Sequence, residues 1–245
     1  MFSRLRRGSA VAAAVVAAGF ALTACSTASE ETSASGESIT VTTNSGDVEV
    51  TTAPKRVVVL DNTAAETVKA FGITPVAVPK QLFATDQLKE WTDNDAVKDV
   101  GTHNEPKFDV IEDVEPDLII GGYRFSKYND DLKKVGDAVG APYIDIAASD
   151  DAADGRVAAM IRQTETLGEI FGKQEQAKQI VDDFQTKLNA AKGVAEGKSV
   201  FLAVVSGGKI DNGAKRLSPL VAPLNVKDVF GGEGGTMTAA NSTPL

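Results

Sequence analysis

The chain has 245 residues, of which 42% are apolar, 24% charged and 6% aromatic; this is globular composition, which excludes a disordered, collagen-like or multi-span membrane protein. The formal net charge of −9 argues against a binder of duplex nucleic acid, which needs a basic face. A single cysteine excludes an internal disulfide, and a single histidine is too few for a histidine-rich zinc or copper site.

The first 25 residues have the pattern of a bacterial lipoprotein signal. Arginines at positions 4, 6 and 7 precede an apolar run of 13 residues, Ala10–Leu22, which is too short to span a bilayer as a mature helix. The run leads into Leu-Thr-Ala-Cys, which resembles a lipobox ending at Cys25. We expect a signal peptide over residues 1–24 and an acylated Cys25 that anchors the chain in the lipid bilayer, on the extracytoplasmic face of the cell membrane. An ordinary secretory signal with a chance cysteine is the alternative.

The next segment changes from tether to folded chain. Residues 25–38 are mostly Ser, Thr, Ala, Glu and Gly without a large apolar side chain, so we expect a flexible tether. Two β-branched runs, Ile39–Thr43 and Val48–Thr52, then flank an Asn-Ser-Gly-Asp turn and predict a β-hairpin.

Short apolar runs then alternate with helical patterns up to residue 150. Because continuous apolar runs are typical of parallel strands buried on both faces, they predict an α/β lobe over residues 39–150. Ligands of such sheets bind beyond the carboxyl ends of the strands, where Asp61-Asn62 and Gly121–Lys127 lie. The expected strands are Val57–Leu60, Val76–Val78, Leu118–Ile120 and Tyr143–Ile146, and the expected helices are residues 63–71, a helix through Phe108, Ile111 and Val114, and residues 129–139.

A long amphipathic helix separates this lobe from a second one. Apolar residues at helical spacing predict a helix over residues 151–172, roughly 30 Å long. A second amphipathic helix follows, and its apolar face runs from Ala177 to Ala191. Together with an apolar strand at Ser199–Val205, this helix opens another α/β unit over residues 173–245. The sequence therefore predicts two α/β lobes joined by one helix.

Four segments of the chain, which follow one another in the order of the family's motifs, resemble the ferric-siderophore-binding lipoproteins of ABC importers. Residues 117–132, DLIIGGYRFSKYNDDL, are similar to that family's "PDLII-x-x-GRQS-x-x-YDEL" segment. Residues 54–73 are similar to its first strand and helix, residues 101–109 to its "VGT-x-x-EP-x-FE" loop, and residues 206–230 to its "GGKI…SRFG…DVLG" region. The resemblance covers about residues 38–232.

The resemblance implies a fold and a set of site residues. The implied fold is a bilobal clamshell of the periplasmic-binding-protein type, with two Rossmann-like lobes and a helical hinge. Arg124 and Arg216 match the arginines that hold a catecholate ligand, and Tyr123, Lys209 and Asn62 are further candidate ligand-binding residues. The family has a third arginine nearer the carboxyl end, past the position that Leu245 occupies here. We therefore expect the second lobe to be partial in this chain. Tyr123 and Phe125 replace the family's usual Gly and Gln beside Arg124.

Physical chemistry supports arginine as the binding group. A ferric tris-catecholate is bulky, aromatic and trianionic, and a guanidinium is permanently charged, planar and able to stack on rings. Since the chelate oxygens saturate the iron, no protein ligand to the metal and no cofactor are expected. The expected partners are the ferric siderophore, the ABC permease subunits and the bilayer, with no nucleic acid, and we expect a monomer without enzymatic activity.

Several alternatives stay open at this stage. The same class of receptor could carry haem or a corrinoid, and the chain could instead be a structural lipoprotein or an inactive fragment. Arg124 could be a surface arginine that caps the helix at Asn129. We expect Trp91 to pack in the core, and His103 to be a polar loop residue rather than a ligand.

Overall fold

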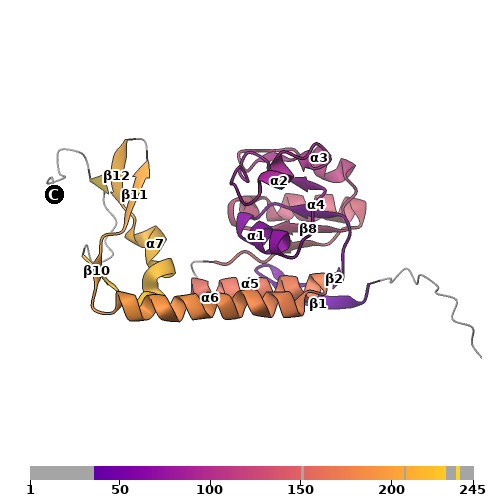
Figure 1. Cartoon of the computed structure of the whole chain (residues 1–245). Helices are drawn as coiled ribbons and strands as arrows, with labels where there is room; N and C mark the ends of the chain where they lie inside the picture. The colour runs from indigo at the N-terminus through magenta and orange to yellow at the C-terminus, as the bar shows by residue number, and fades with distance from the viewer. Residues whose placement is uncertain (1–35, 150–151, 207, 230–235, 238–245) are drawn as a thin grey trace, which may run out of the picture. The chain divides into compact units, whose positions relative to one another are not determined.

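The centre of the fold is a five-stranded parallel sheet with strand order β5-β4-β3-β8-β9 (Figure 1). The computed structural model describes residues 36–149, 152–206, 208–229 and 236–237. The predicted signal peptide, Cys25, most of the predicted tether and the glycine-rich stretch 231–235 lie outside these residues. The strands are β3 (Val57–Val59), β4 (Ala77–Val78), β5 (Lys98–Asp99), β8 (Leu118–Gly121) and β9 (Tyr143–Asp145).

Both faces of this sheet are buried, as the continuous apolar runs predict. Val57 and Val59 of β3 belong to one apolar core, whereas Val58 between them belongs to a second core. The first core includes residues of α1 (Asn62–Ala70), α2 (Lys89–Thr92) and α5, and the second includes residues of α3 (Phe108–Asp113) and α4 (Asn129–Val139). Trp91 is fully buried in the first core, which confirms that it packs.

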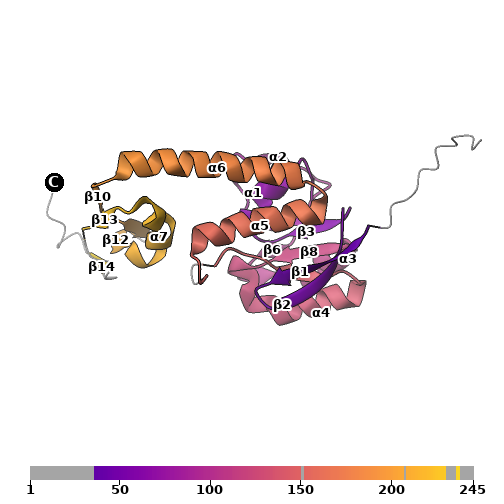
Figure 2. The ribbon, with the colours of Figure 1, turned by 90° about the horizontal axis from the view of Figure 1, so that it is seen from below.

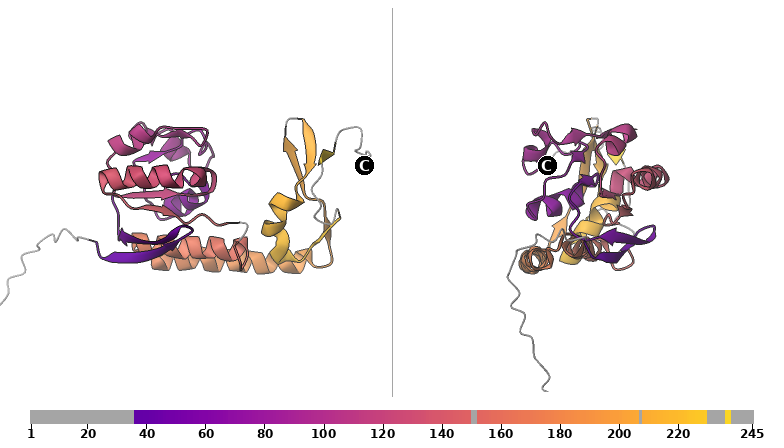
Figure 3. Two further views of the ribbon diagram at one scale, coloured as in Figure 1. Left: turned by 180° about the vertical axis from the view of Figure 1, so that it is seen from behind. Right: turned by 90° about the vertical axis from the view of Figure 1, so that its right-hand side faces the viewer.

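Two small antiparallel ribbons accompany the sheet. β1 (Ser38–Thr43) pairs with β2 (Gly46–Thr51) around the turn Asn44-Ser45, so the turn is shorter than the expected four residues. Gly46, at φ +113°, occupies a backbone conformation that favours glycine and allows this tight turn. This hairpin lies beside α5 (Figure 3), and the chain just after it donates a hydrogen bond from Ala53 N to Ile170 O. The second ribbon, β6 (Gly101–Thr102) with β7 (Glu105–Pro106), encloses His103 in its turn.

Two long helices follow the sheet and lie side by side (Figure 2). α5 (Arg156–Phe171) ends at Gly172, whose φ of +63° is the left-handed conformation of a helix C-cap, and α6 (Gln174–Ala195) begins two residues later. α5 is shorter than the expected helix over 151–172, and the described chain between residues 152 and 155 is not helical.

Gly168 lets these two helices approach closely. A Cβ built on Gly168 would lie 2.6 Å from the Cβ of Ala177 in α6, whereas a Cβ on Gly193, also in α6, would meet nothing within 4 Å. We expect Gly168→Ala to destabilise the chain by about 1–3 kcal/mol, because neither methyl group can turn away. Gly193→Ala is the matched control, and it should stabilise by about 0.5–1 kcal/mol through helix propensity alone. Urea denaturation of both variants measures the difference, and equal shifts would contradict the close packing at Gly168.

The chain after α6 forms further short elements. β10 (Ser199–Val200) pairs in parallel with β13 (Lys227–Asp228), whereas β11 (Ala203–Ser206) pairs with β12 (Lys209–Asn212), which also pairs with β14 (Thr236–Met237). The expected single strand over 199–205 is therefore wrong, because the chain changes from one sheet to another at Phe201-Leu202. α7 (Ala214–Val221) and η2 (Ala222–Leu224) lie between β12 and β13. None of the helices in the described ranges is both long and apolar enough to cross a membrane.

Candidate functional site

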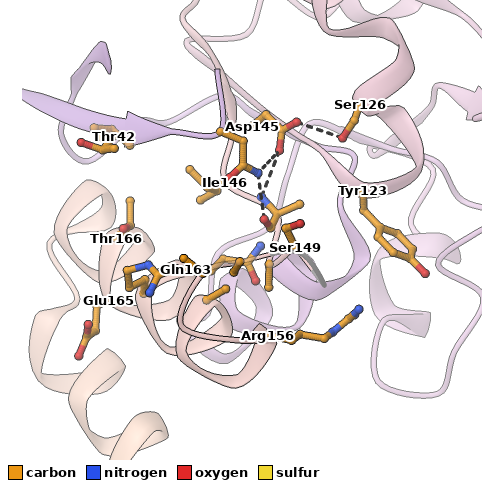
Figure 4. A pocket seen from close by; sticks show the side chains of 18 of the residues that line it. Thr42, Tyr123, Ser126, Asp145, Ile146, Ser149, Arg156, Gln163, Glu165 and Thr166 are labelled. Atoms are coloured by element: carbon orange, nitrogen blue, oxygen red, sulfur yellow. Dashed lines mark hydrogen bonds between the residues drawn. The ribbon is translucent and has the colours of Figure 1, made fainter. Parts of the chain in front are cut away.

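A pocket of about 970 Å³ lies where β9 ends and α5 begins (Figure 4). Because β8 and β9 are parallel, their carboxyl ends meet at this edge of the sheet, which is where α/β sheets bind ligands. The walls come from the hairpin, the loop after β8, the end of β9 and the polar face of α5, including Thr42, Tyr123, Asp145, Arg156, Arg162 and Glu165.

The buried carboxylate of Asp145 joins several segments of the chain at the pocket. The residue is 97% buried, and its carboxylate accepts hydrogen bonds from Ser126 Oγ at 3.0 Å and Asn129 Nδ2 at 3.2 Å. It also accepts from Asn44 Nδ2 at 2.9 Å and from the backbone N of Ala147 at 3.2 Å. These donors belong to four different segments, so one carboxylate ties the hairpin turn to the loop after β8.

Tyr143 extends this network on the side of α4. Its hydroxyl donates to Asn129 Oδ1 at 2.7 Å. Burial, together with the nearby carboxylates of Asp145 and Asp61, raises the pKa of Tyr143 well above its usual range. The hydroxyl therefore remains a donor at physiological pH and fixes the Asn129 amide, whose nitrogen then faces Asp145.

The loop after β8 begins with two residues of positive φ. Gly122 has φ +114°, and a Cβ there would lie 2.5 Å from Asp145 Oδ1, so this position requires glycine. Tyr123 follows with φ +52°, at the start of η1 (Tyr123–Tyr128), and 45% of the residue is exposed. A non-glycine residue held in this region costs about 1–3 kcal/mol. The backbone of Tyr123 thus has an unfavourable conformation, and its aromatic side chain lies at the pocket.

Arg124 projects from the same loop. Its guanidinium carbon lies 5.8 Å from the centroid of the Tyr123 ring, within the range of a cation–π contact, and the residue is exposed. Its guanidinium makes no hydrogen bond or ion pair with any of the residues that the structure describes. α4 begins without a side-chain cap, so the alternative role of Arg124 as a cap of that helix is wrong. Arg124 itself is not a wall residue of the pocket but adjoins one.

Asn62 and Lys209, two of the other predicted residues, do not line this pocket. Asn62 lines a different hollow, of about 280 Å³, between α1, α5 and α6. Lys209 is an exposed residue of β12 and does not line the pocket. Arg216 lies in α7, and its side chain is outside what the structure describes.

Asp61 caps α1, which begins one residue before the expected helix over 63–71. Its Oδ1 accepts from Thr63 N at 2.9 Å, and its Oδ2 accepts from Gln163 Nε2 of α5, also at 2.9 Å. Burial raises the pKa of Asp61 above its usual value, while the hydrogen bonds from Thr63 and Gln163 oppose that rise. The first turn of α1 is thereby fastened to the middle of α5.

The polar face of α5 contributes pocket residues that were not predicted from the sequence. Arg156 and Arg162 line the pocket, and Arg162 forms an ion pair with Asp154. The amphipathic pattern of this helix was the available signal, since the residues opposite the apolar face had to meet solvent or a site. No group of three acidic, histidine or cysteine side chains in the described part of the chain could hold a metal ion.

Comparison with known proteins places this architecture in a class. The model of a family described as "Periplasmic binding protein" matches residues 57–235. Among solved structures, the periplasmic catecholate-siderophore binding protein VctP from Vibrio cholerae has a TM-score of 0.68 at 26% identity, over 78% of this chain and 67% of that chain. A TroA-like periplasmic binding protein from Xylanimonas cellulosilytica has a TM-score of 0.63 at 26% identity, over 79% of this chain and 68% of that chain. The fold is the α/β fold of TroA-like periplasmic binding proteins, which confirms the expected fold class.

The chain belongs to the periplasmic binding protein family. The petrobactin-binding protein YclQ of Bacillus subtilis (strain 168) is 29% identical over 187 residues, which are 73% of this chain and 53% of that protein. The Fe(3+)-citrate-binding protein YfmC of the same organism is 30% identical over 168 residues, which are 64% of this chain and 51% of that protein. The chain thus spans about half the length of the curated relatives it matches. Because the family consists of binding proteins, the expectation of a non-enzymatic protein is confirmed.

Proposed function

We propose that this protein is the extracytoplasmic solute-binding lipoprotein of an ABC importer, which captures an iron–siderophore complex and delivers it to the permease. The observation that carries the proposal is the exposed Arg124 guanidinium within cation–π range of the Tyr123 ring, beside a pocket at the carboxyl edge of the sheet. A fixed cation next to an aromatic face suits an anionic chelate with aromatic rings.

The relatives support this assignment. Two of them are named as a petrobactin-binding protein and an Fe(3+)-citrate-binding protein, and two further Bacillus subtilis relatives, YhfQ and YfiY, have "lipoprotein" in their names. Together with the lipobox-like sequence at Cys25, this supports a receptor held to the outer side of the cell membrane by lipid. In the proposed receptor, residues 39–150 and 173–245 contribute to two lobes joined through the helix after residue 150, with Arg216 as the cation of the second lobe.

The proposal is tested by titrating the purified chain with ferric and iron-free siderophores while recording tyrosine fluorescence. Saturable quenching by the ferric complex, and a weaker response to the iron-free compound, is the expected result. Haem and a cobalt corrinoid belong in the same experiment because they represent the alternative cargoes. No saturable response to any of these ligands would refute the transport function and favour a structural lipoprotein.

Arg124 should account for a measurable part of the affinity. We expect Arg124→Ala to weaken binding of a ferric tris-catecholate about tenfold or more, since roughly 1.4 kcal/mol of lost interaction corresponds to one decade. Lys133→Ala removes an exposed cation of α4 and serves as the control that should leave binding unchanged. Isothermal titration of the three proteins measures the effect, and an unchanged affinity of Arg124→Ala would refute its role.

A further inference from the structure

Tyr123 has an unfavourable backbone conformation that the packing around it does not require. Its φ of +52° is in the left-handed region, which glycine, asparagine and aspartate tolerate better than an aromatic residue. The preceding Gly122 must be a glycine, because Asp145 and Ala147 fill the space of a Cβ. At position 123 the side chain points outward and is 45% exposed, so a smaller residue would leave no hole in the core.

An exposed and strained aromatic side chain beside a pocket suggests a role in binding. The Tyr123 ring lines the pocket (Figure 4), and the Arg124 guanidinium lies 5.8 Å from its centroid. The loop beneath the ring is immobilised by the hydrogen bond from Ser126 to Asp145. The backbone that carries the ring is therefore fixed at the pocket, which lowers the entropy that the loop loses when a ligand stacks on the ring.

We propose that Tyr123 is a specificity-determining residue that favours iron chelates with aromatic rings over aliphatic chelates of similar charge. The inference rests on the proposed function. An aromatic ring of the chelate stacks against the exposed part of the tyrosine ring, while the neighbouring Arg124 guanidinium interacts with the chelate oxygens. An aliphatic hydroxycarboxylate chelate uses only the second of these interactions, because it has no ring to stack.

Two substitutions in the purified chain separate the ring from the strain. Tyr123→Gly removes both, and Tyr123→Leu removes the ring while it keeps a side chain at positive φ. The probes are ferric tris-catecholate and ferric citrate, measured by isothermal titration. Both variants should bind the catecholate about three- to tenfold more weakly, with no fall in the affinity for ferric citrate. Only Tyr123→Gly should also raise the midpoint of thermal unfolding, by about 2 °C.

The outcomes distinguish this inference from the proposed function. If the wild-type chain binds the catecholate and Tyr123→Gly binds it within twofold of wild type, the role of Tyr123 is overturned while the transport function stands. An equal loss of affinity for both chelates in Tyr123→Gly also overturns it, because the ring would then serve binding in general. If the wild-type chain binds neither chelate, the iron-chelate function fails and the inference fails with it.

Discussion

Asp145→Ala should destabilise the chain by about 3–5 kcal/mol. The substitution removes the acceptor of Ser126, Asn129, Asn44 and the Ala147 backbone N at once. Each donor left buried without a partner costs roughly 1–3 kcal/mol, and those near the pocket recover part of this cost by binding water. The loop that presents Tyr123 and Arg124 also loses the link to Asn44 of the hairpin that runs through this carboxylate, so ligand affinity should fall in the same variant.

Urea denaturation at pH 7.5, followed through the fluorescence of the buried Trp91, measures this effect. Asp137→Ala is the matched control, because Asp137 is an exposed carboxylate on α4 and its removal should change stability by less than about 0.5 kcal/mol. A loss of unfolding free energy below about 1 kcal/mol in Asp145→Ala would show that water replaces the carboxylate as the acceptor of these hydrogen bonds. The network would then contribute little to the stability of the fold.

Four of the five strands of the sheet could be predicted from the sequence because they are short apolar runs, whereas β5 was missed because its two residues, Lys98 and Asp99, are charged and not buried. Val57–Val59 and Leu118–Gly121 are short apolar runs without alternation, and both faces of such a strand meet helices. The helix starts were less predictable: aspartate and asparagine are equally good caps, and the choice of Asp61 over Asn62 depends on backbone geometry.

The site could be predicted only where it is local in sequence. The loop with Tyr123 and Arg124 follows directly from a strand end, so its position at the sheet edge could be expected. The pocket walls from α5 could not, since periodicity marks a polar face but not what that face meets. The contact between Asn44 and Asp145 joins residues 101 positions apart, and nothing in the local sequence of either residue indicates the other. The role of Arg216 remains a prediction.

Asp61→Ala should destabilise the chain by about 2–3 kcal/mol at pH 7.5, and by more at pH 5. The loss has two parts, the N-cap of α1 and the acceptor of Gln163 Nε2. The pH dependence arises because burial raises the pKa of Asp61 in the folded chain above its unfolded value of 3.8. Between these two pKa values the folded chain binds more protons than the unfolded chain, so this carboxyl stabilises the fold most at low pH, and that stability is lost as the pH rises through the folded pKa.

Alanine has no proton to bind, so the difference in unfolding free energy between wild type and Asp61→Ala should shrink as the pH rises from 3.8 through the folded pKa of Asp61, and should be constant above it. Urea denaturation of both proteins across this range measures it, and Asp61→Asn provides the control because it keeps a cap without a titrating group. A difference that grew with pH would mean that the hydrogen bonds from Thr63 and Gln163 outweigh burial and hold the carboxyl in its charged form. The contact between α1 and α5 would then be a hydrogen bond from a neutral amide to a charged carboxylate, and its strength would increase rather than decrease toward neutral pH.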